Sequence, residues 1–281
     1  MTLDYVCPPR SKYRTVIVLS KDCEIEDKLA LAHQLLSPKF EVEGIVAYGK
    51  GGTGAIKKFL ALMRLEKYTV LEGDNGSGEP SEGARFIAER AMAADERPLY
   101  VAAYGALTDA ARAVQLCPET EKTLTVVWCG GAAWPCGGRE RHLEEDVDAA
   151  NYLMASQTKL WQLPDNAYGQ IKLTAAEATN RIGNAGAQGR YFAEKIKKRI
   201  DKSGSNCLEI PGEAVVGAMI NPFDHSYDCL PAPHINHQMY YVRNQYRRPV
   251  RVYYFIDSRM MLEDFYSKMS VLYADGEGEQ G

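Results

Sequence analysis

The feature that most constrains the fold is a regular alternation of short apolar runs and amphipathic segments over the first 165 residues. Residues 16–19 (VIVL), 98–104 (PLYVAAY) and 123–129 (TLTVVWC) are almost uninterrupted apolar runs. Runs of this length and β-branched content are typical of strands that are buried on both faces. Strands that alternate with helices predict a parallel sheet with right-handed crossovers.

The predicted elements can be given by residue range. Strands are expected at 13–20, 40–48, 68–72, 98–104, 123–129, 160–164, 239–243 and 248–256. Helices are expected at 26–36, 55–65, 82–94, 108–116, 147–156, 174–182, 188–200, 212–220 and 258–273. Residues 221–237 show no clear period. We therefore predict one α/β domain over residues 1–281, with a mostly parallel central sheet, helices on both faces, a loose arm at 1–12 and a disordered tail at 275–281.

Composition narrows the class of protein. Hydrophobic residues make up 46% of the chain and charged residues 25%, which is typical of a soluble globular protein. The net charge is −4 and there is no basic run, so neither nucleic acid nor an anionic membrane is an expected partner. We find no apolar stretch that could span a bilayer and no secretory signal. Seven scattered cysteines without a CxxC pair favour reduced thiols in the cytoplasm over disulfides or a zinc site.

Four carboxylates stand directly after the first predicted strand, at Asp22, Glu24, Glu26 and Asp27. One interpretation is a site for a hard cation such as Ca²⁺ or Mg²⁺, which prefers oxygen ligands. The other is compensation of the dipole of the helix that begins here. In parallel sheets ligands bind beyond the carboxyl ends of the strands, so this cluster faces a crevice in either case. The spacing alone leaves both interpretations open.

Other candidate sites have weaker sequence support. The glycine loop at 49–54 matches neither GxGxxG nor the P-loop pattern, and we interpret it as a turn. Cys129 and Cys136 lack a recognisable base partner and are interpreted as structural thiols. Trp134 lies in a loop after a strand, which makes it the best candidate for a wall that stacks against a planar base.

A group of histidines and aspartates follows the predicted helix at 212–220. It contains Asp224, His225, Asp228, His234 and His237. The spacing lacks the HxxxH form of a helical metal site. A substrate-binding loop, or ordinary surface residues, is the favoured interpretation over a metal cluster.

Several motifs, taken in order, resemble the inosine–uridine-preferring nucleoside hydrolase family over nearly the whole chain. The family's DxDxxxDD cluster corresponds to SKDCEIED at 20–27, and its glycine–leucine–threonine–asparagine turn corresponds to YGALTD at 104–109. Further matches are VVWCGG at 126–131, ERH with DVDAAN at 140–151, and RPVRV with EDF at 248–265. The chain is similar to a divergent member of this family.

The resemblance implies an N-ribosyl hydrolase of nucleoside salvage that works on small-molecule nucleosides and forms dimers or tetramers. It also implies one Ca²⁺ per subunit, which holds the ribose hydroxyls and the attacking water. Carried over by motif, Asp22 is a metal ligand and the general base, and Asp27 is a second ligand. The backbone carbonyl of Tyr104 and the carboxylate of Glu213 complete the implied metal site.

The resemblance also implies substrate contacts. Glu140 and Glu26 correspond to ribose-binding positions, and Lys50 stands where a ribose-contacting asparagine is expected. His142 replaces another asparagine and is a candidate for both catalysis and substrate binding. The segment 221–241, with Asp224 and His225, is expected to shape the base pocket together with His142 and Trp134.

Departures from the family motifs predict an altered specificity. Ser20 replaces the first aspartate of the cluster, and Gly212 stands where the family often has a histidine. We therefore expect a modified nucleoside, such as queuosine, rather than inosine or uridine. The same departures suggest an alternative, a non-catalytic protein that binds nucleosides or sugars on this scaffold. A third hypothesis is a different α/β hydrolase that uses a cysteine or serine nucleophile.

Overall fold

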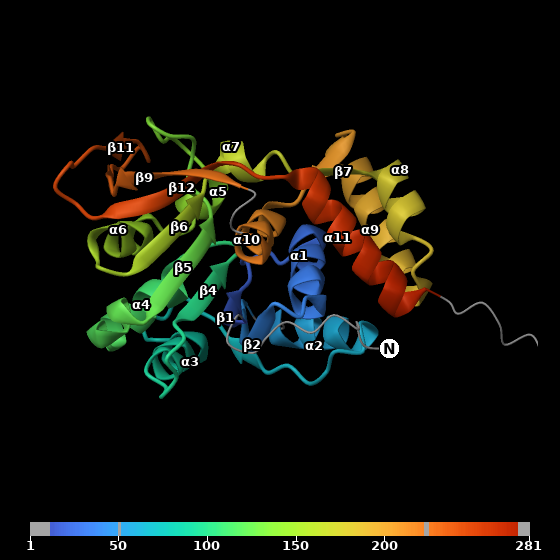
Figure 1. Cartoon of the computed structure of the whole chain (residues 1–281), viewed down its shortest axis with the longest axis horizontal. Coiled ribbons are helices and arrows are strands. Elements are labelled where there is room, and N and C mark those ends of the chain that lie inside the picture. Colours follow the sequence, from blue (N-terminus) through green and yellow to red (C-terminus); the bar gives the residue numbers. More distant parts are fainter. Residues whose placement is uncertain (1–11, 50–51, 222–224, 275–281) are drawn as a thin grey trace, which may run out of the picture.

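The computed structural model describes residues 12–49, 52–221 and 225–274, and its centre is one eight-stranded sheet (Figure 1). The strand order is β3–β2–β1–β4–β5–β6–β12–β9, and every neighbouring pair is parallel except β12–β9. The strands are β1 (Tyr13–Val18), β2 (Phe40–Ala47), β3 (Val70–Glu72), β4 (Leu99–Ala103), β5 (Leu124–Cys129), β6 (Lys159–Leu163), β9 (Ser226–Pro231) and β12 (Pro249–Phe255). The predicted α/β class and mostly parallel sheet are confirmed.

Helices cover both faces of this sheet because the central strands are apolar on both sides. In β1, Ile17 packs on one face, while Val16 and Val18 pack on the other. The first face carries α1 (Ile25–Leu36), α2 (Gly52–Leu62) and α10 (Pro211–Ile220). The second face carries α3 (Glu82–Ala91), α4 (Thr108–Leu116) and α6 (Val147–Ala155).

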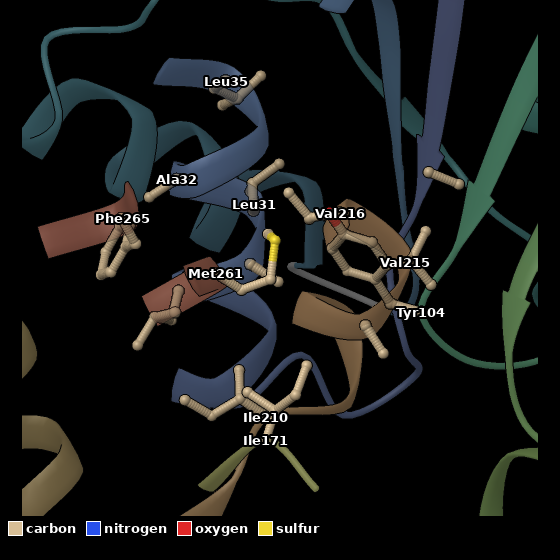
Figure 2. Close-up of a cluster of buried hydrophobic side chains, with 14 of the residues drawn as sticks. Leu31, Ala32, Leu35, Tyr104, Ile171, Ile210, Val215, Val216, Met261 and Phe265 are labelled. Atoms are coloured by element: carbon tan, nitrogen blue, oxygen red, sulfur yellow. The ribbon is translucent and has the colours of Figure 1, made fainter. Parts of the chain in front are cut away.

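A further helical layer lies outside α1 and α10. It consists of α9 (Gly186–Ser203) and α11 (Ser258–Tyr273), which pack against each other and against α1 (Figure 1). Figure 2 shows Met261 of α11 between Leu31 of α1 and Val216 of α10, and Phe265 of α11 beside Ala32 of α1. Helix α1 therefore has apolar neighbours on two sides, which explains why almost all of its residues are buried.

Short elements complete the fold. They are α5 (Arg141–Glu144), α7 (Asp165–Tyr168), α8 (Ala175–Glu177), the 3-10 turn η2 (Pro118–Lys122), the π-turn η3 (Ala178–Ile182), the pair β7 (Lys172–Thr174) and β8 (Cys207–Glu209), and the pair β10 (His234–Ile235) and β11 (Tyr241–Val242). Most are too short to leave a periodic signal in a sequence. In the part of the chain that the structure describes, no helix is long and apolar enough to cross a membrane.

The structure adds one strand that the sequence did not predict and corrects the extent of one loop. The segment 221–237, which showed no period, contains β9, an edge strand that pairs antiparallel with β12. Most residues of β9 are exposed, so the strand lacks the apolar pattern that would reveal it. The glycine loop at 49–54 is also shorter than expected, because Gly52 and Gly54 already lie in the first turns of α2. Residues 1–11 and the tail at 275–281 lie outside the described residues.

A nearly buried ion cluster fixes the amino end of the sheet. The Arg14 guanidinium on β1 donates from Nε to Glu43 Oε1 of β2 at 2.7 Å, and Arg90 of α3 contacts the same carboxylate. The side chains of Arg14 and Glu43 are 2% and 8% exposed. Arg14 also donates to the backbone carbonyl of Arg90 at 2.9 Å, so this cluster joins the sheet to α3.

We predict that Glu43→Ala lowers the free energy of unfolding by about 2–4 kcal/mol, because the buried Arg14 guanidinium loses its shortest ion pair and keeps only Asp95, at 3.5 Å, as a carboxylate partner. Glu41→Ala is the matched control, since Glu41 forms a more exposed ion pair with Arg97 at 2.8 Å. We expect it to cost less than about 1 kcal/mol. Urea unfolding followed by circular dichroism measures both values, and equal losses would contradict the assignment.

Candidate active site

A pocket of about 360 Å³ opens beyond the carboxyl end of β1. Its walls come from the β1–α1 loop, the first turn of α1, the short helix α5 and the last turns of α9. The lining residues are Ser20, Asp22, Glu24, Glu26, Asp27, Arg141, His142, Glu144, Glu145 and Arg199. The acidic cluster found in the sequence therefore forms one wall of a pocket at the place where parallel sheets bind ligands.

Asp27 lies at the buried end of this wall. Its carboxylate accepts a hydrogen bond from the Ser20 hydroxyl, which in turn accepts one from the backbone N–H of Cys23 at 3.2 Å. Burial raises the pKa of Asp27 to about 7, and the neighbouring charge of Glu26 adds to this effect. The loop itself thus supplies a donor for the most buried carboxylate of the pocket.

Glu26 is buried at the base of the pocket wall, whereas Asp22 is exposed to solvent. Glu26 is 3% exposed and forms an ion pair with Arg199 of α9 at 3.3 Å between Nη2 and Oε1. Its other oxygen, Oε2, has no hydrogen-bond partner among the described residues. Asp22 is exposed and stands at the mouth of the pocket. Glu26 and Asp27 also lie in the first turn of α1, so the dipole interpretation and the pocket interpretation are compatible.

His142 faces the pocket from α5. Its Nδ1 donates to the backbone carbonyl of Cys129 at 2.7 Å, which fixes the ring and leaves Nε2 as an acceptor in the neutral form. Burial lowers the pKa of His142. The side chain therefore favours a neutral imidazole, which can accept a hydrogen bond from a ligand.

The Glu140 carboxylate is hydrogen bonded within the protein by four donors. It accepts hydrogen bonds from the backbone N–H groups of Gly131, His142 and Leu143 at 2.6, 3.1 and 3.0 Å. The Tyr168 hydroxyl donates to it at 2.7 Å. Glu140 thus caps α5 and ties it to the β5 loop, and it is not among the residues that line the pocket. Its implied contact with ribose stays a prediction.

Tyr104 and Glu213 lie behind the pocket rather than in its wall. The Tyr104 hydroxyl donates to Gln34 Oε1 at 2.6 Å, and its ring lies among side chains of α1 and α10 (Figure 2). Glu213, at the start of α10, is fully buried, and its Oε2 is 2.8 Å from Nδ1 of His33. Its Oε1 has no hydrogen-bond partner among the described residues.

The described residues do not fit the four-ligand calcium site that the resemblance implies. In the described part of the chain, no group of three or more histidine, cysteine, aspartate or glutamate side chains is arranged to hold a metal ion. Asp22 and Asp27 share the pocket, but Glu213 is held by His33 outside it. We therefore derive no catalytic step through a metal.

The remaining predicted residues lie elsewhere. Trp134 lines a separate cavity of about 660 Å³ with Leu230 and Tyr246, and its Nε1 donates to Gln162 at 2.9 Å. It is therefore not a wall of the Asp22 pocket. His225 is buried, and its Nδ1 accepts from the backbone N–H of Asp257 at 3.2 Å. Lys50 and Asp224 fall outside the described residues.

Comparisons with known proteins identify the fold. No protein-family model matches the sequence, and no curated protein does. Among solved structures, a purine-preferring ribonucleoside hydrolase from Gardnerella vaginalis aligns with a TM-score of 0.79 at 18% identity, over 93% of this chain and 99% of that one. The protein has the nucleoside hydrolase fold.

Two other structures with the nucleoside hydrolase fold agree with this result. An inosine–guanosine nucleoside hydrolase aligns with a TM-score of 0.75 at 15% identity, over 92% of this chain and 99% of that one. An inosine–uridine preferring nucleoside hydrolase from Bacillus anthracis aligns with a TM-score of 0.71 at 14% identity, again over 92% and 99%. The fold that the motifs implied is confirmed.

Within this nucleoside hydrolase fold, the pocket contains residues that sequence reasoning missed. Arg141 stands between Glu140 and His142, two residues predicted from the sequence to lie at the site. That position could have identified it. Arg199 comes from the last turns of α9 and has no local motif. Its contact with Glu26 spans 173 residues of sequence, and only tertiary packing reveals it.

The Glu140 cap can be tested by stability. We predict that Glu140→Ala lowers the free energy of unfolding by about 2–4 kcal/mol, because a cap is lost and buried donors are left unpaired. Glu144→Ala, which removes the exposed partner of Arg139, is the control and should cost less than about 1 kcal/mol. Thermal or urea unfolding measures the difference. A loss for Glu140→Ala no larger than the control would refute the structural role.

Proposed function

We propose that the protein hydrolyses the N-glycosidic bond of a ribonucleoside and releases the free base and ribose. The observation that carries this proposal is the pocket beside Asp22, at the carboxyl end of β1 in a nucleoside hydrolase fold. The solved structures that align with this chain are nucleoside hydrolases by name, and each is covered almost completely by the alignment.

The charge of the pocket suits this reaction. Six carboxylates and only two guanidiniums line it, so its field is negative. Cleavage of a glycosidic bond gives the sugar oxocarbenium character, and fixed negative groups stabilise the positive charge that develops. A neutral nucleoside carries no such charge before cleavage, so the pocket stabilises the transition state more than the bound substrate. This difference is what accelerates a reaction.

Each lining residue can be given a role that its position allows. Asp22, exposed at the mouth, takes the proton from the attacking water as general base. Glu26 Oε2 and His142 Nε2 accept hydrogen bonds from ribose hydroxyls. Within the described residues Arg141 forms no hydrogen bond or ion pair, and its guanidinium is available to orient the leaving base. Asp27, whose pKa burial raises to about 7, adds to the negative field when it is ionised.

A modified nucleoside is the proposed substrate class. His142 replaces a side chain expected to contact ribose, and Arg199 pairs with Glu26, so the sugar-contacting wall differs from the one implied by the family motifs. The carboxylates of Glu144 and Glu145 line the same pocket and complement an amino group on a base. Queuosine, whose base carries an amine, has this property.

The test is a panel of nucleosides that contains inosine, guanosine, adenosine, uridine, cytidine and queuosine, with released ribose measured as reducing sugar. We expect wild type to release ribose from at least one of them. Asp22→Asn should lower kcat by about 10²-fold or more, because a carboxylate base is lost. Glu96→Gln, an exposed acid before β4, is the control and should leave kcat unchanged. Full activity in Asp22→Asn would eliminate Asp22 as the base.

The alternative is a protein that binds nucleosides or sugars without cleaving them. The observation that favours it is the Ser20–Asp27 hydrogen bond, which ties the deepest carboxylate of the pocket to its own loop. The same panel separates the two functions when binding is measured by calorimetry beside ribose release. Tight binding of a nucleoside with no ribose released by wild type would establish the alternative.

A further inference from the structure

His33 lies in a helical layer that is mostly apolar but contains a small group of buried charged side chains. It belongs to α1 and is fully buried, with the Phe265 ring of α11 5.5 Å from its own. The apolar part of this layer includes Leu31, Val216 and Met261, which Figure 2 shows in one cluster. A polar ring in such a place needs hydrogen-bond partners, because burying it without them is unfavourable.

Both ring nitrogens of His33 face carboxylates. Nδ1 is 2.8 Å from Glu213 Oε2 on α10, and Nε2 is 2.9 Å from Asp264 Oδ2 on α11. Lys268 of α11 contacts Asp264 and lies 3.3 Å from His33 Nε2. The result is a chain of alternating acidic and basic groups that links α1, α10 and α11.

This chain accounts for Glu213 without a metal ligand role. An acid at the buried start of α10 requires a compensating group, and His33 supplies it from within the fold. A cation bound to the other oxygen, Oε1, would share this carboxylate with the His33 imidazolium, whose two nitrogens donate to Glu213 and Asp264. The Lys268 ammonium, 3.3 Å from Nε2, adds a second positive charge. Like charges at such short range oppose metal binding.

Gly212 shows why the imidazole comes from α1. A Cβ atom at this position would lie 2.7 Å from the Ala30 Cβ and 3.1 Å from the Tyr104 ring. A side chain next to Glu213 on α10 therefore has no room, and a histidine cannot enter the site from there. The space beside Gly212 is filled by Ala30 of α1 and by Tyr104. His33, also on α1, contacts the Glu213 carboxylate at Oε2.

We propose that His33 is a positioning residue that holds Glu213 as an internal partner and thereby removes it from calcium binding. Two consequences follow. Wild-type protein has no calcium affinity that depends on Glu213. Replacing His33 with an apolar residue leaves the buried Glu213 carboxylate without its partner, and a cation such as Ca²⁺ can then take that place. This inference concerns the metal, and it holds whichever nucleoside the pocket accepts.

The experiment is a calorimetric titration of chelator-treated protein with CaCl₂. For wild type and Glu213→Gln we expect the same weak or absent binding. For His33→Leu we expect affinity to rise by about tenfold or more, because affinity follows the charge of the available ligands. The gain should disappear in His33→Leu/Glu213→Gln. His234→Leu, which changes an exposed histidine of β10, is the matched control and should behave as wild type.

Thermal unfolding in the presence and absence of CaCl₂ provides a second readout. His33→Leu should melt below wild type without calcium and recover with it, because the cation takes over the partner role of His33. Calcium binding by wild type that weakens tenfold in Glu213→Gln would overturn the proposal. So would a folded His33→Leu that gains no affinity. The comparison of wild type with Glu213→Gln decides the matter even where His33→Leu fails to fold, and none of these results depends on nucleoside cleavage.

Discussion

Carboxylates that are buried at the carboxyl end of a parallel sheet lose hydration and need a hydrogen-bond donor or a cation in exchange. This constraint shapes the pocket and the layer behind it. Asp27 receives a hydrogen bond from Ser20, Glu26 pairs with Arg199, and Glu213 pairs with His33. Each partner comes from the chain itself. The ion pair between Arg199 and Glu26 joins α9 to α1, and the contact between Asp264 and His33 joins α11 to α1.

The hydrogen-bond partners of the acidic residues indicate which acids have a structural role and which are available for chemistry. Glu140, with three backbone donors and the Tyr168 hydroxyl, serves to hold α5 against the β5 loop. That anchoring orients His142, whose ring is fixed through the carbonyl of Cys129. Asp22 differs from these residues because it is exposed at the pocket mouth. An acid that remains in contact with water is the one best placed to act on it.

Much of the fold could be predicted because buried parallel strands and amphipathic helices leave strong patterns. The helix expected at 258–273 is α11 with the same bounds, and the helix expected at 108–116 is α4. The edge strand β9 escaped prediction because its residues are mostly exposed and show no alternation. Part of the site was accessible in the same way. Asp22 and Asp27 were visible as an acidic cluster, but Trp134 proved to line a different cavity.

The sequence by itself determined that an acidic loop follows a buried strand in a parallel α/β protein, because local patterns of apolar and polar residues encode this order. Tertiary structure decided what each acid contacts. Arg199 and Glu26 are 173 residues apart, and His33 and Glu213 are 180 apart. Contacts over such distances depend on how helices pack across the sheet, and packing is a property of the whole core. The acidic loop can thus be predicted from the sequence, whereas the residues that contact its acids are known only from the tertiary structure.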